Sequence, residues 1–443
     1  MNAAHVEVST VLVDDVGDWL MRSALAGADL ESLVRGFCER LAAAGLPLAR
    51  IHLSFSVLHP LYRAAGFTWR RGEGMQAEAY PHARDGLSDL FKRSPYYYLL
   101  NNNLNILRRR IAGSGKSEFS IFDDLRETGI TDYFAFVQRF ESASSQAMMG
   151  SWSTDIEEGF SDSAISALLR IQNQLAVATR MAVLGKLADN MLSTYLGSDA
   201  GKRVLNGQIK RGDGETIRAA LVMADMRNST GLAEELGRQV YIEMLNQFYD
   251  AIAVPFNSGG GQILSFIGDG FLAVYPCERH QEPSRIACRA ALAAANAATA
   301  SMAELNRARL SVGSPQIGYG IGLHIGNVMF GNVGLADRLT FSVFGAAVNQ
   351  AQRLESLTKK YPAEIIASEA FADYCGGEWT LFGTEKLRGI AQPVKVFAPP
   401  AANLAAATVP EPAGVRGDQL SGAEHLLMLH REGKLAAAAA ARP

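Results

Sequence analysis

Cysteine is scarce in this sequence, with four residues among 443 and no Cys-x-x-Cys pair. Cys38, Cys277, Cys288 and Cys375 are scattered, which argues against a zinc ribbon or a disulfide framework and fits a reducing cytoplasm. No apolar run reaches the roughly 18 residues needed to cross a bilayer, and the N-terminus lacks the pattern of a signal peptide. We therefore expect a cytoplasmic protein without a membrane span.

A large excess of charge of one sign is also missing. The formal net charge is -3, and no long basic run occurs, which argues against nucleic-acid binding as the main role. Hydrophobic residues make up 48% of the chain and charged residues 20%, as in ordinary globular proteins. The length allows two ordinary domains with a connector.

The first half of the chain predicts an α+β domain over residues 28–180, after a short lead-in over residues 1–27. Apolar residues at helical spacing from Leu30 to Ala44 precede the alternating segment "IHLSFSVLH", which is typical of a strand. The cluster Tyr96-Tyr97-Tyr98 could line a ligand pocket, but packing is the favoured interpretation. No cysteine or histidine constellation marks a haem, bilin or metal site.

A long helix connects the two halves, followed by a glycine-rich charged linker, and together they cover residues 181–215 as a transducer segment. Its apolar residues step by three and four, at positions Leu168, Ile171, Leu175, Leu184, Leu187, Met191 and Tyr195. The stripe can pack on its own domain or pair with a second copy in a parallel two-chain helix. Spacing alone favours the first alternative.

The second half, residues 216–399, alternates strands and helices in the order βααβ-βαβ-αβ. This order and a long antiparallel hairpin suggest a ferredoxin-like α/β core. We expect one helix over residues 230–256, another over 283–306, and a strand pair around the turn Gly326-Asn327. Residues 400–443 are rich in Ala and Pro and are expected to be a flexible tail.

Two aspartates stand where their carboxylates can meet. Asp225 ends the apolar segment "IRAALVMADM", and Asp269 lies between Gly268 and Gly270 in "LSFIGDGFLAVY". Both glycines are expected to take the positive φ angles of a tight turn. If the strands are neighbours, the carboxylates form a site suited to Mg²⁺ or Mn²⁺. The motif taken alone is also explained by Asp and Gly being good hairpin residues.

Two further segments carry polar groups at useful spacing. "DMRNSTGL" places small polar residues before a helix, where backbone N–H groups could hold phosphates, or where Ser229 or Thr230 simply caps the helix. "VNQAQRLE" puts Asn349 and Arg353 on one helix face, where they could bind a ribose and a phosphate charge. A solvated helix face is the plain alternative.

Together these segments resemble the catalytic domain of the class III adenylate/guanylate cyclases over about Gly185 to Ala398. "YLGSDAGKRVLNGQIKRGDGETIRAALVMADMRNSTGLAEEL" is similar to the transducer and first metal-binding strand of bacterial members. "GGGQILSFIGDGFLAVYP" is similar to their second metal-binding hairpin, and "LHIGNVMFGNVGLADRLTFSVFGAAVNQAQRLESL" to their strand pair and dimer-site helix. "LRGIAQPVKVFAP" is similar to their closing strand.

The resemblance implies a head-to-tail homodimer with active sites at the interface. One chain would supply the metal ligands Asp225 and Asp269 for two Mg²⁺ or Mn²⁺ ions, and the other the catalytic Asn349 and Arg353. A nucleoside triphosphate would become a 3′,5′-cyclic nucleotide and pyrophosphate. The nucleotide-binding residues that it implies are Met226, Asn228, Ser229, Thr230, Gly268, Ser265, Ser342 and Lys395.

The sequence departs from the family at the base-reading positions. Where adenylate cyclases usually have lysine and guanylate cyclases glutamate, this chain has Ser265, and the partner position is Ser342. Losing one hydrogen bond to the base relaxes discrimination by about 1–3 kcal/mol if nothing replaces it. ATP is the first expectation, with GTP or a pyrimidine triphosphate left open.

The segment "GSWSTDIEEGFSDSAISALLRIQ" is typical of a final strand followed by an exit helix, and with it the N-terminal domain resembles the small sensor domains of the GAF kind. This resemblance implies an unidentified small-molecule or protein input that regulates the second domain. A different class of function stays open. The same fold could serve as a catalytically silent nucleotide-binding module, which Ser265 favours and the joint presence of Asp225, Asp269, Asn349 and Arg353 disfavours. A polymerase-like phosphoryl transferase would need a basic template surface, which the sequence lacks.

Overall fold

The computed structural model describes residues 9–57, 59–82, 87–113, 117–140, 147–388, 390 and 392–400. The chain divides into two compact units between Met191 and Leu192, inside helix α6 (Asp162–Leu196). Apart from its first residue, the predicted tail over 400–443 lies outside the described residues. None of the described helices is both long and apolar enough to cross a membrane.

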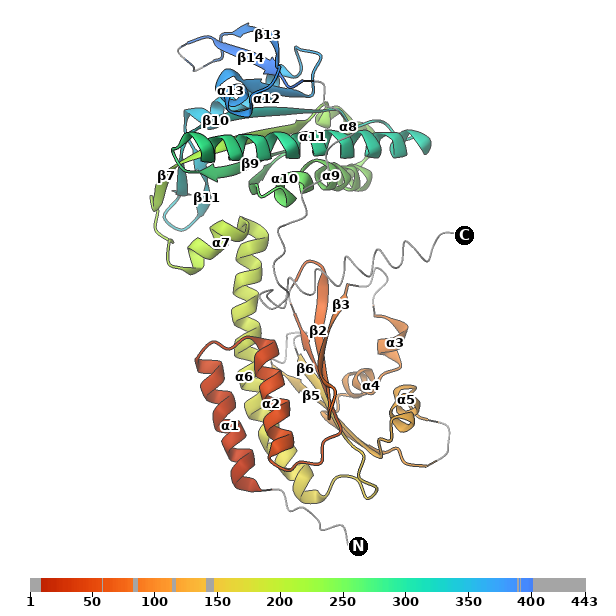
Figure 1. The fold of residues 1–443 in the computed structure, drawn as a ribbon. Helices are drawn as coiled ribbons and strands as arrows, with labels where there is room; N and C mark the ends of the chain where they lie inside the picture. Colours follow the sequence, from red (N-terminus) through yellow and green to blue (C-terminus); the bar gives the residue numbers. More distant parts are fainter. Residues whose placement is uncertain are drawn as a thin grey trace. The chain divides into compact units, whose positions relative to one another are not determined.

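The first unit is built on one antiparallel sheet of six strands in the order β3-β2-β1-β6-β5-β4 (Figure 1). Alternation along β1 sends Ile51, Leu53 and Phe55 into a core that also contains buried residues of α1, α2 and α6. A second core lies between the other face and helices α4 and α5. The strands are β1 (Arg50–Ser56), β2 (Tyr62–Arg70), β3 (Gly74–Pro81), β4 (Ile106–Arg110), β5 (Asp132–Arg139) and β6 (Ala147–Thr154).

The helices of this unit are α1 (Thr10–Leu25), α2 (Leu30–Ala43), α3 (Asp89–Lys92), α4 (Pro95–Asn101), α5 (Ile121–Glu127) and the first part of α6. Helix α1 corrects the expectation that residues 1–27 are a mere lead-in. Ser9 caps α1, and Val13, Val16 and Leu20 are buried in the main core. The apolar spacing in that segment is that of a core helix.

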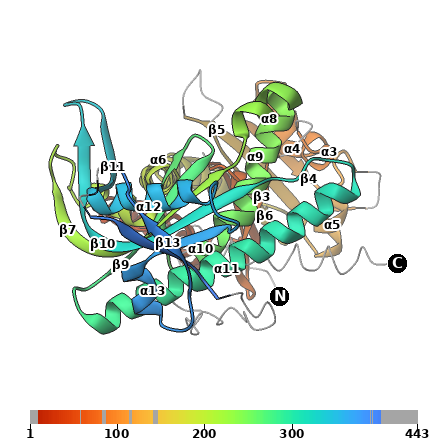
Figure 2. The ribbon, with the colours of Figure 1, turned by 90° about the horizontal axis from the view of Figure 1, so that it is seen from above.

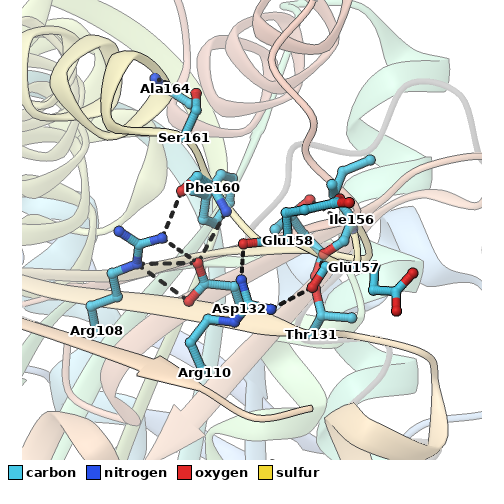
Figure 3. A network of polar contacts seen from close by, with 11 residues as sticks. Arg108, Arg110, Thr131, Asp132, Ile156, Glu157, Glu158, Phe160, Ser161 and Ala164 are labelled. Atoms are coloured by element: carbon cyan, nitrogen blue, oxygen red, sulfur yellow. Dashed lines mark hydrogen bonds and ion pairs between the residues drawn. The ribbon is translucent and has the colours of Figure 1, made fainter. Parts of the chain in front are cut away.

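A buried carboxylate fixes the connection from β6 into α6 (Figure 3). Asp132, whose side chain is fully buried, accepts hydrogen bonds from Arg108 Nη2 at 2.7 Å and from the Phe160 backbone N at 3.0 Å. Arg108 also donates to the Phe160 carbonyl at 2.6 Å, and Arg110 donates to the carbonyls of Glu157 and Glu158. The segment that leads into the connecting helix is therefore tied to the edge strand β4 and its neighbour β5 by charge-assisted hydrogen bonds.

Helix α6 is buried only along its first half. Leu168, Ile171 and Leu175 belong to the main core of the first unit, as one alternative predicted. Leu184 is 46% exposed and Tyr195 78% exposed. The apolar stripe therefore divides into a part that packs on its own unit and a part with solvent-exposed apolar side chains.

The second unit contains an eight-stranded sheet, with order β13-β14-β12-β10-β7-β9-β8 and β11 paired with β10 (Figure 1, Figure 2). With the helices between the strands, it confirms the predicted α+β class. Its strands are β7 (Gly214–Met226), β8 (Gln262–Ile267), β9 (Gly270–Cys277), β10 (Tyr319–Gly334), β11 (Leu339–Phe344), β12 (Ile365–Ser368), β13 (Thr380–Glu385) and β14 (Val394–Ala398).

The segment around Gly326 and Asn327 is not a turn between two strands. It lies inside the single strand β10, which pairs with β7 from Tyr319 to Gly331. The hairpin is instead the β10–β11 connection after Gly334. Glycine and asparagine in a strand need not break it when a neighbouring strand pairs with the backbone, and here Asn327 stays in register opposite Arg218 of β7.

Strand β7 lies near the centre of the sheet and is covered on both faces. Ala220, Val222 and Ala224 pack into a core with α9, α10 and α11, while Leu221 and Met223 pack into a core with α7 and α12. The helices are α7 (Ser198–Leu205), α8 (Ser229–Leu236), α9 (Arg238–Ile252), α10 (Val254–Ser258), α11 (Gln281–Ser311), α12 (Ala346–Leu357) and α13 (Glu369–Cys375). The helix expected over 230–256 is thus three helices, because Gly237 takes a φ of 72° and Pro255 begins a new turn.

Candidate functional site

The two predicted metal aspartates lie next to each other in the structure. Asp225 is the second-last residue of β7, and Asp269 lies in the turn between β8 and β9. The register pairs Asp225 with Gly270, so the strand pairing itself brings the two carboxylates to one end of the sheet. Burial and the negative charge of Asp269 raise the pKa of Asp225, and the Lys359 ammonium opposes this.

The two glycines around Asp269 have different roles. Gly268 takes a φ of 64°, in the left-handed region that favours glycine. Gly270 has no positive φ, which corrects the expectation for this residue. A Cβ on Gly270 would lie 2.5 Å from the Ala224 carbonyl oxygen and 2.7 Å from Asp225 Oδ1, so the missing side chain is what lets the two strands and the carboxylate come together.

A tyrosine that the sequence patterns did not single out fixes the hairpin turn. The Tyr249 hydroxyl donates to the Gly268 carbonyl oxygen at 2.8 Å, and the Tyr249 ring packs edge-on against Phe266. Burial, and after it the charge of Asp269, raises the pKa of Tyr249 to about 12, so this hydroxyl stays a hydrogen-bond donor at neutral pH. Helix α9 thus holds the turn that carries Asp269.

The expected phosphate-binding segment directly follows Asp225. Met226 is buried at the end of β7, and Asn228 precedes α8 with a φ of 59° and no side-chain capping bond. Ser229 and Thr230 form the first turn of α8, so neither is its N-cap, contrary to the plain alternative. The structure therefore places these four residues beside the carboxylate pair with the α8 N-terminus uncapped by a side chain.

Helix α12 carries the predicted catalytic pair. Asn349 is exposed and Arg353 is half-buried, and both lie on one face of the helix. The Arg353 Nε atom is buried and has no hydrogen-bond partner among the described residues. A buried guanidinium nitrogen without a partner is unfavourable, and an anionic ligand would satisfy it.

A buried glutamate two residues further along α12 was missed by the sequence patterns. Glu355 is only 3% exposed, and its Oε1 has no hydrogen-bond partner in the described part of the chain. Burial and the neighbouring charge of Asp225 raise the pKa of Glu355 to about 7. A Cβ on Gly320, the residue paired with Asp225, would lie 2.9 Å from Glu355 Oε1, which locates this carboxyl over the strand beside the metal aspartate.

The two predicted base-reading serines lie on strands β8 and β11, which contact each other without pairing. Ser265 follows a bulge in β8, where the pairing with β9 shifts between Ile263 and Ser265. Ser342 is a buried residue of β11, opposite Gly331. A joint role of the two serines in reading the base stays a prediction.

Lys395, the remaining predicted nucleotide-binding residue, is not brought to the carboxylate pair within one chain. It lies in β14, separated from β7 by β12 and β10, and forms an ion pair with Glu369 at 2.7 Å. Its predicted contact with phosphate stays a prediction that requires this pair to open or the partner copy to approach.

The aromatic cluster of the first unit is a packing element. Tyr96 is buried, and its hydroxyl donates a hydrogen bond to Ser151 Oγ at 3.1 Å. Tyr97 and Tyr98 make edge contacts with Phe91 and Phe119. These contacts agree with the packing interpretation of the three tyrosines.

Residues 214–375 match the model of the adenylate and guanylate cyclase catalytic domain. The matched range contains Asp225, Asp269, Asn349 and Arg353. The match to the adenylate and guanylate cyclase catalytic domain over these residues agrees with the resemblance that the sequence motifs indicated.

The similar proteins share this part of the chain. An uncharacterized protein of Mycobacterium tuberculosis is 32% identical over 191 residues, which cover 42% of this chain and 32% of that protein. An uncharacterized Mycobacterium bovis protein is 34% identical over 192 residues, with coverages of 42% and 32%. The match thus spans about a third of the length of these curated relatives.

Solved cyclase structures are similar over the same share. The guanylyl cyclase Cya2 is 26% identical, with a TM-score of 0.37, and the match covers 42% of this chain and 92% of that one. The adenylyl cyclase CyaB of P. aeruginosa is 22% identical, with a TM-score of 0.38 and coverages of 42% and 94%.

Proposed function

We propose that this protein is a metal-dependent nucleotidyl cyclase that converts a nucleoside triphosphate, ATP before others, to a 3′,5′-cyclic nucleotide and pyrophosphate. The observation that carries this proposal is the adjacent carboxylate pair Asp225 and Asp269 at one end of the sheet, inside a domain of the cyclase family. A hairpin with only a structural role would not need its aspartate, Asp269, beside a second carboxylate. Here burial and the charge of Asp269 together raise the pKa of Asp225.

The chemistry of this pair fits Mg²⁺ or Mn²⁺. Two hard oxygen donors repel each other here, and a divalent cation would relieve that repulsion. No cluster of three or more His, Cys, Asp or Glu side chains suited to a metal occurs among the described residues, so water and the triphosphate would complete the coordination of two ions. Such ions would lower the pKa of the ribose 3′-hydroxyl and offset the negative charge of the triphosphate.

The protein side chains would then position the substrate. The α8 N-terminus with Asn228, Ser229 and Thr230 binds phosphate oxygens through its backbone N–H groups. Asn349 orients the ribose. Arg353 stabilises negative charge on the α-phosphate, and its unpaired Nε can donate a hydrogen bond to a phosphate oxygen. By the family resemblance, Asn349 and Arg353 serve the carboxylate pair of a second copy, which makes the active form a head-to-tail homodimer.

Base selection would rest on Ser265 and Ser342. Both offer short hydroxyls that donate or accept, so neither enforces adenine as a lysine would. We propose ATP as the main substrate with relaxed discrimination against GTP or a pyrimidine triphosphate. A catalytically silent nucleotide-binding module is the second candidate, and the loss of the lysine at Ser265 is the observation that favours it.

Regulation would come from the first unit through α6. The unit would act as a GAF-like input domain over about residues 28–180, with α1 added to its core, for an unidentified small molecule or protein in the cytoplasm. Pairing of the exposed apolar side chains on the second half of α6 between two copies would transmit that input. A rotation between copies would move Arg353 relative to Asp269 and change turnover.

The test is product analysis by mass spectrometry. The purified chain is incubated with Mn²⁺ or Mg²⁺ and with ATP, GTP, CTP or UTP separately. We expect cyclic AMP as the main product, and its loss in Asp269→Asn with the thermal unfolding temperature retained. Cyclic GMP or a pyrimidine product as the main species would place specificity at Ser265. Absence of any product, with and without the first unit, would instead support the silent module.

A further inference from the structure

A cavity of about 660 Å³ opens in the second unit at the end of the sheet away from the carboxylate pair. Its walls come from the start of β7, the beginning of α11, strand β10 and helix α13. The cationic side chains in its lining are Arg218, Arg279, Arg285 and, when protonated, His280, and Asp373 is the one carboxylate in the lining. In a chain with a net charge of -3, this is a local concentration of positive charge.

Arg218 forms the inner wall and is held by neutral partners only. Its Nε donates to Ser284 Oγ at 3.0 Å, its Nη2 donates to the Tyr374 hydroxyl at 3.3 Å, and its guanidinium lies 5.6 Å from the centre of the Tyr374 ring. These contacts fix the side chain without neutralising its charge. The charge is felt by its neighbours, because it adds to burial in lowering the pKa of His324 to about 4.

The rim adds charge that is only partly balanced. Arg285 pairs with Glu282 at 3.3 Å in an exposed pair, which solvent screens. Neither Arg218 nor Arg279 forms an ion pair with any side chain in the described ranges. Asn327 on β10 and the N-terminus of the 31-residue helix α11 supply further hydrogen-bond donors at the same opening.

This cavity is separate from the proposed catalytic end. Arg218 precedes Asp225 by seven residues on the same strand, which corresponds to about 23 Å at the usual rise per residue. The volume is within the range of small-molecule sites, and planar arginine forks suit phosphate oxygens. We propose that the cavity formed by Arg218, Arg279, Arg285 and Asn327 binds a small phosphate-bearing anion. This site does not rest on the proposed cyclase activity.

The proposal is tested by calorimetric titration of the full chain with inorganic pyrophosphate at low ionic strength, with EDTA present to remove divalent metals. We expect saturable binding of one pyrophosphate per chain that weakens as salt is added. The double variant Arg279→Glu/Arg285→Glu should weaken binding by at least about tenfold, since two attractive charges become repulsive. Arg218→Gln should do the same by removing the fixed inner charge.

Two matched controls decide where the anion binds. Arg307→Glu reverses an exposed charge on the same helix, 22 residues beyond Arg285 or about 33 Å away, and should leave binding unchanged. Arg353→Ala changes the catalytic end and should also leave it unchanged. Absence of binding to the wild-type chain, or equal binding to the Arg279/Arg285 double variant, overturns the proposal. So does loss of binding in Arg353→Ala alone, or equally tight binding of hexaglutamate, which would reveal an unspecific basic surface.

Discussion

Glu355→Gln should remove a pH dependence from the stability of the second unit. The Glu355 carboxyl is buried over Gly320 beside Asp225, and its pKa is raised from 4.5 to about 7. Between these two values the unfolded chain has already released the proton that the folded chain still holds. The free energy of unfolding therefore falls as pH rises from about 4.5 to about 7. Above pH 7, Glu355 no longer contributes to its pH dependence. Glutamine has a similar shape and does not ionise.

The size of the effect follows from the shift. A difference of about 2.5 pKa units corresponds to about 3 kcal/mol at neutral pH and above. Wild type and Glu355→Gln should thus differ little at pH 4.5, and the variant should gain up to about 3 kcal/mol relative to wild type by pH 8. Asp225 also has a raised pKa, but it is present in both proteins, so the comparison cancels most of its effect.

Hydrogen exchange of backbone amides, followed by mass spectrometry, measures this difference locally. Peptides from β7 and β10 report the opening of the sheet under α12, and peptides from β1 and β6 of the other unit are the internal reference. Exchange free energies would be compared between pH 5 and 8 under conditions in which they report the opening equilibrium. If the pH profiles of wild type and Glu355→Gln run parallel, the carboxyl is not held neutral by its surroundings, and the reasoning fails.

Three other changes test the geometry. Gly270→Ala should lower the free energy of unfolding by about 1–3 kcal/mol and reduce cyclase turnover more than tenfold, because the added Cβ would displace the Asp225 carboxylate. Urea unfolding and a turnover assay measure the two effects, and a stable, fully active variant would contradict this expectation. Asp132→Ala should destabilise the first unit by about 3–5 kcal/mol, since Arg108 loses its buried partner, and urea unfolding of that unit would measure it. Tyr249→Phe should cost about 0.5–1.5 kcal/mol, and a melting temperature equal to that of wild type would show that its hydrogen bond to the hairpin turn is unimportant.

The carboxylate pair could be predicted from the sequence because both halves of the signal are local. An apolar strand that ends in Asp225 and an aspartate between two glycines each stand out in a short window. The family resemblance then put the two windows together. The local pattern could not explain why residue 270 must be glycine. The reason is that its backbone approaches a strand more than 40 residues away in the sequence.

Residues defined by contacts across the fold were missed. Nothing in "AQRLESL" distinguishes Glu355 from a solvated glutamate, and its burial becomes visible only when α12 lies on β10. Tyr249 reads as one more apolar position of an amphipathic helix. The expectation of a turn at Gly326 failed for the same reason, because pairing with β7 decides the conformation of that backbone.

The glycines of β10 have a mechanical consequence for the helix above them. Any side chain at Gly320, Gly322 or Gly326 would collide with Thr358, the α12 backbone or Ala347, so α12 rests on bare strand backbone. At these three positions no side chain separates the helix from the strand, so we expect α12, with its arginine and asparagine, to move together with the sheet. In the proposed homodimer, an input would therefore change the distance between this helix and the carboxylate pair of the other copy by reorienting whole units rather than by bending one.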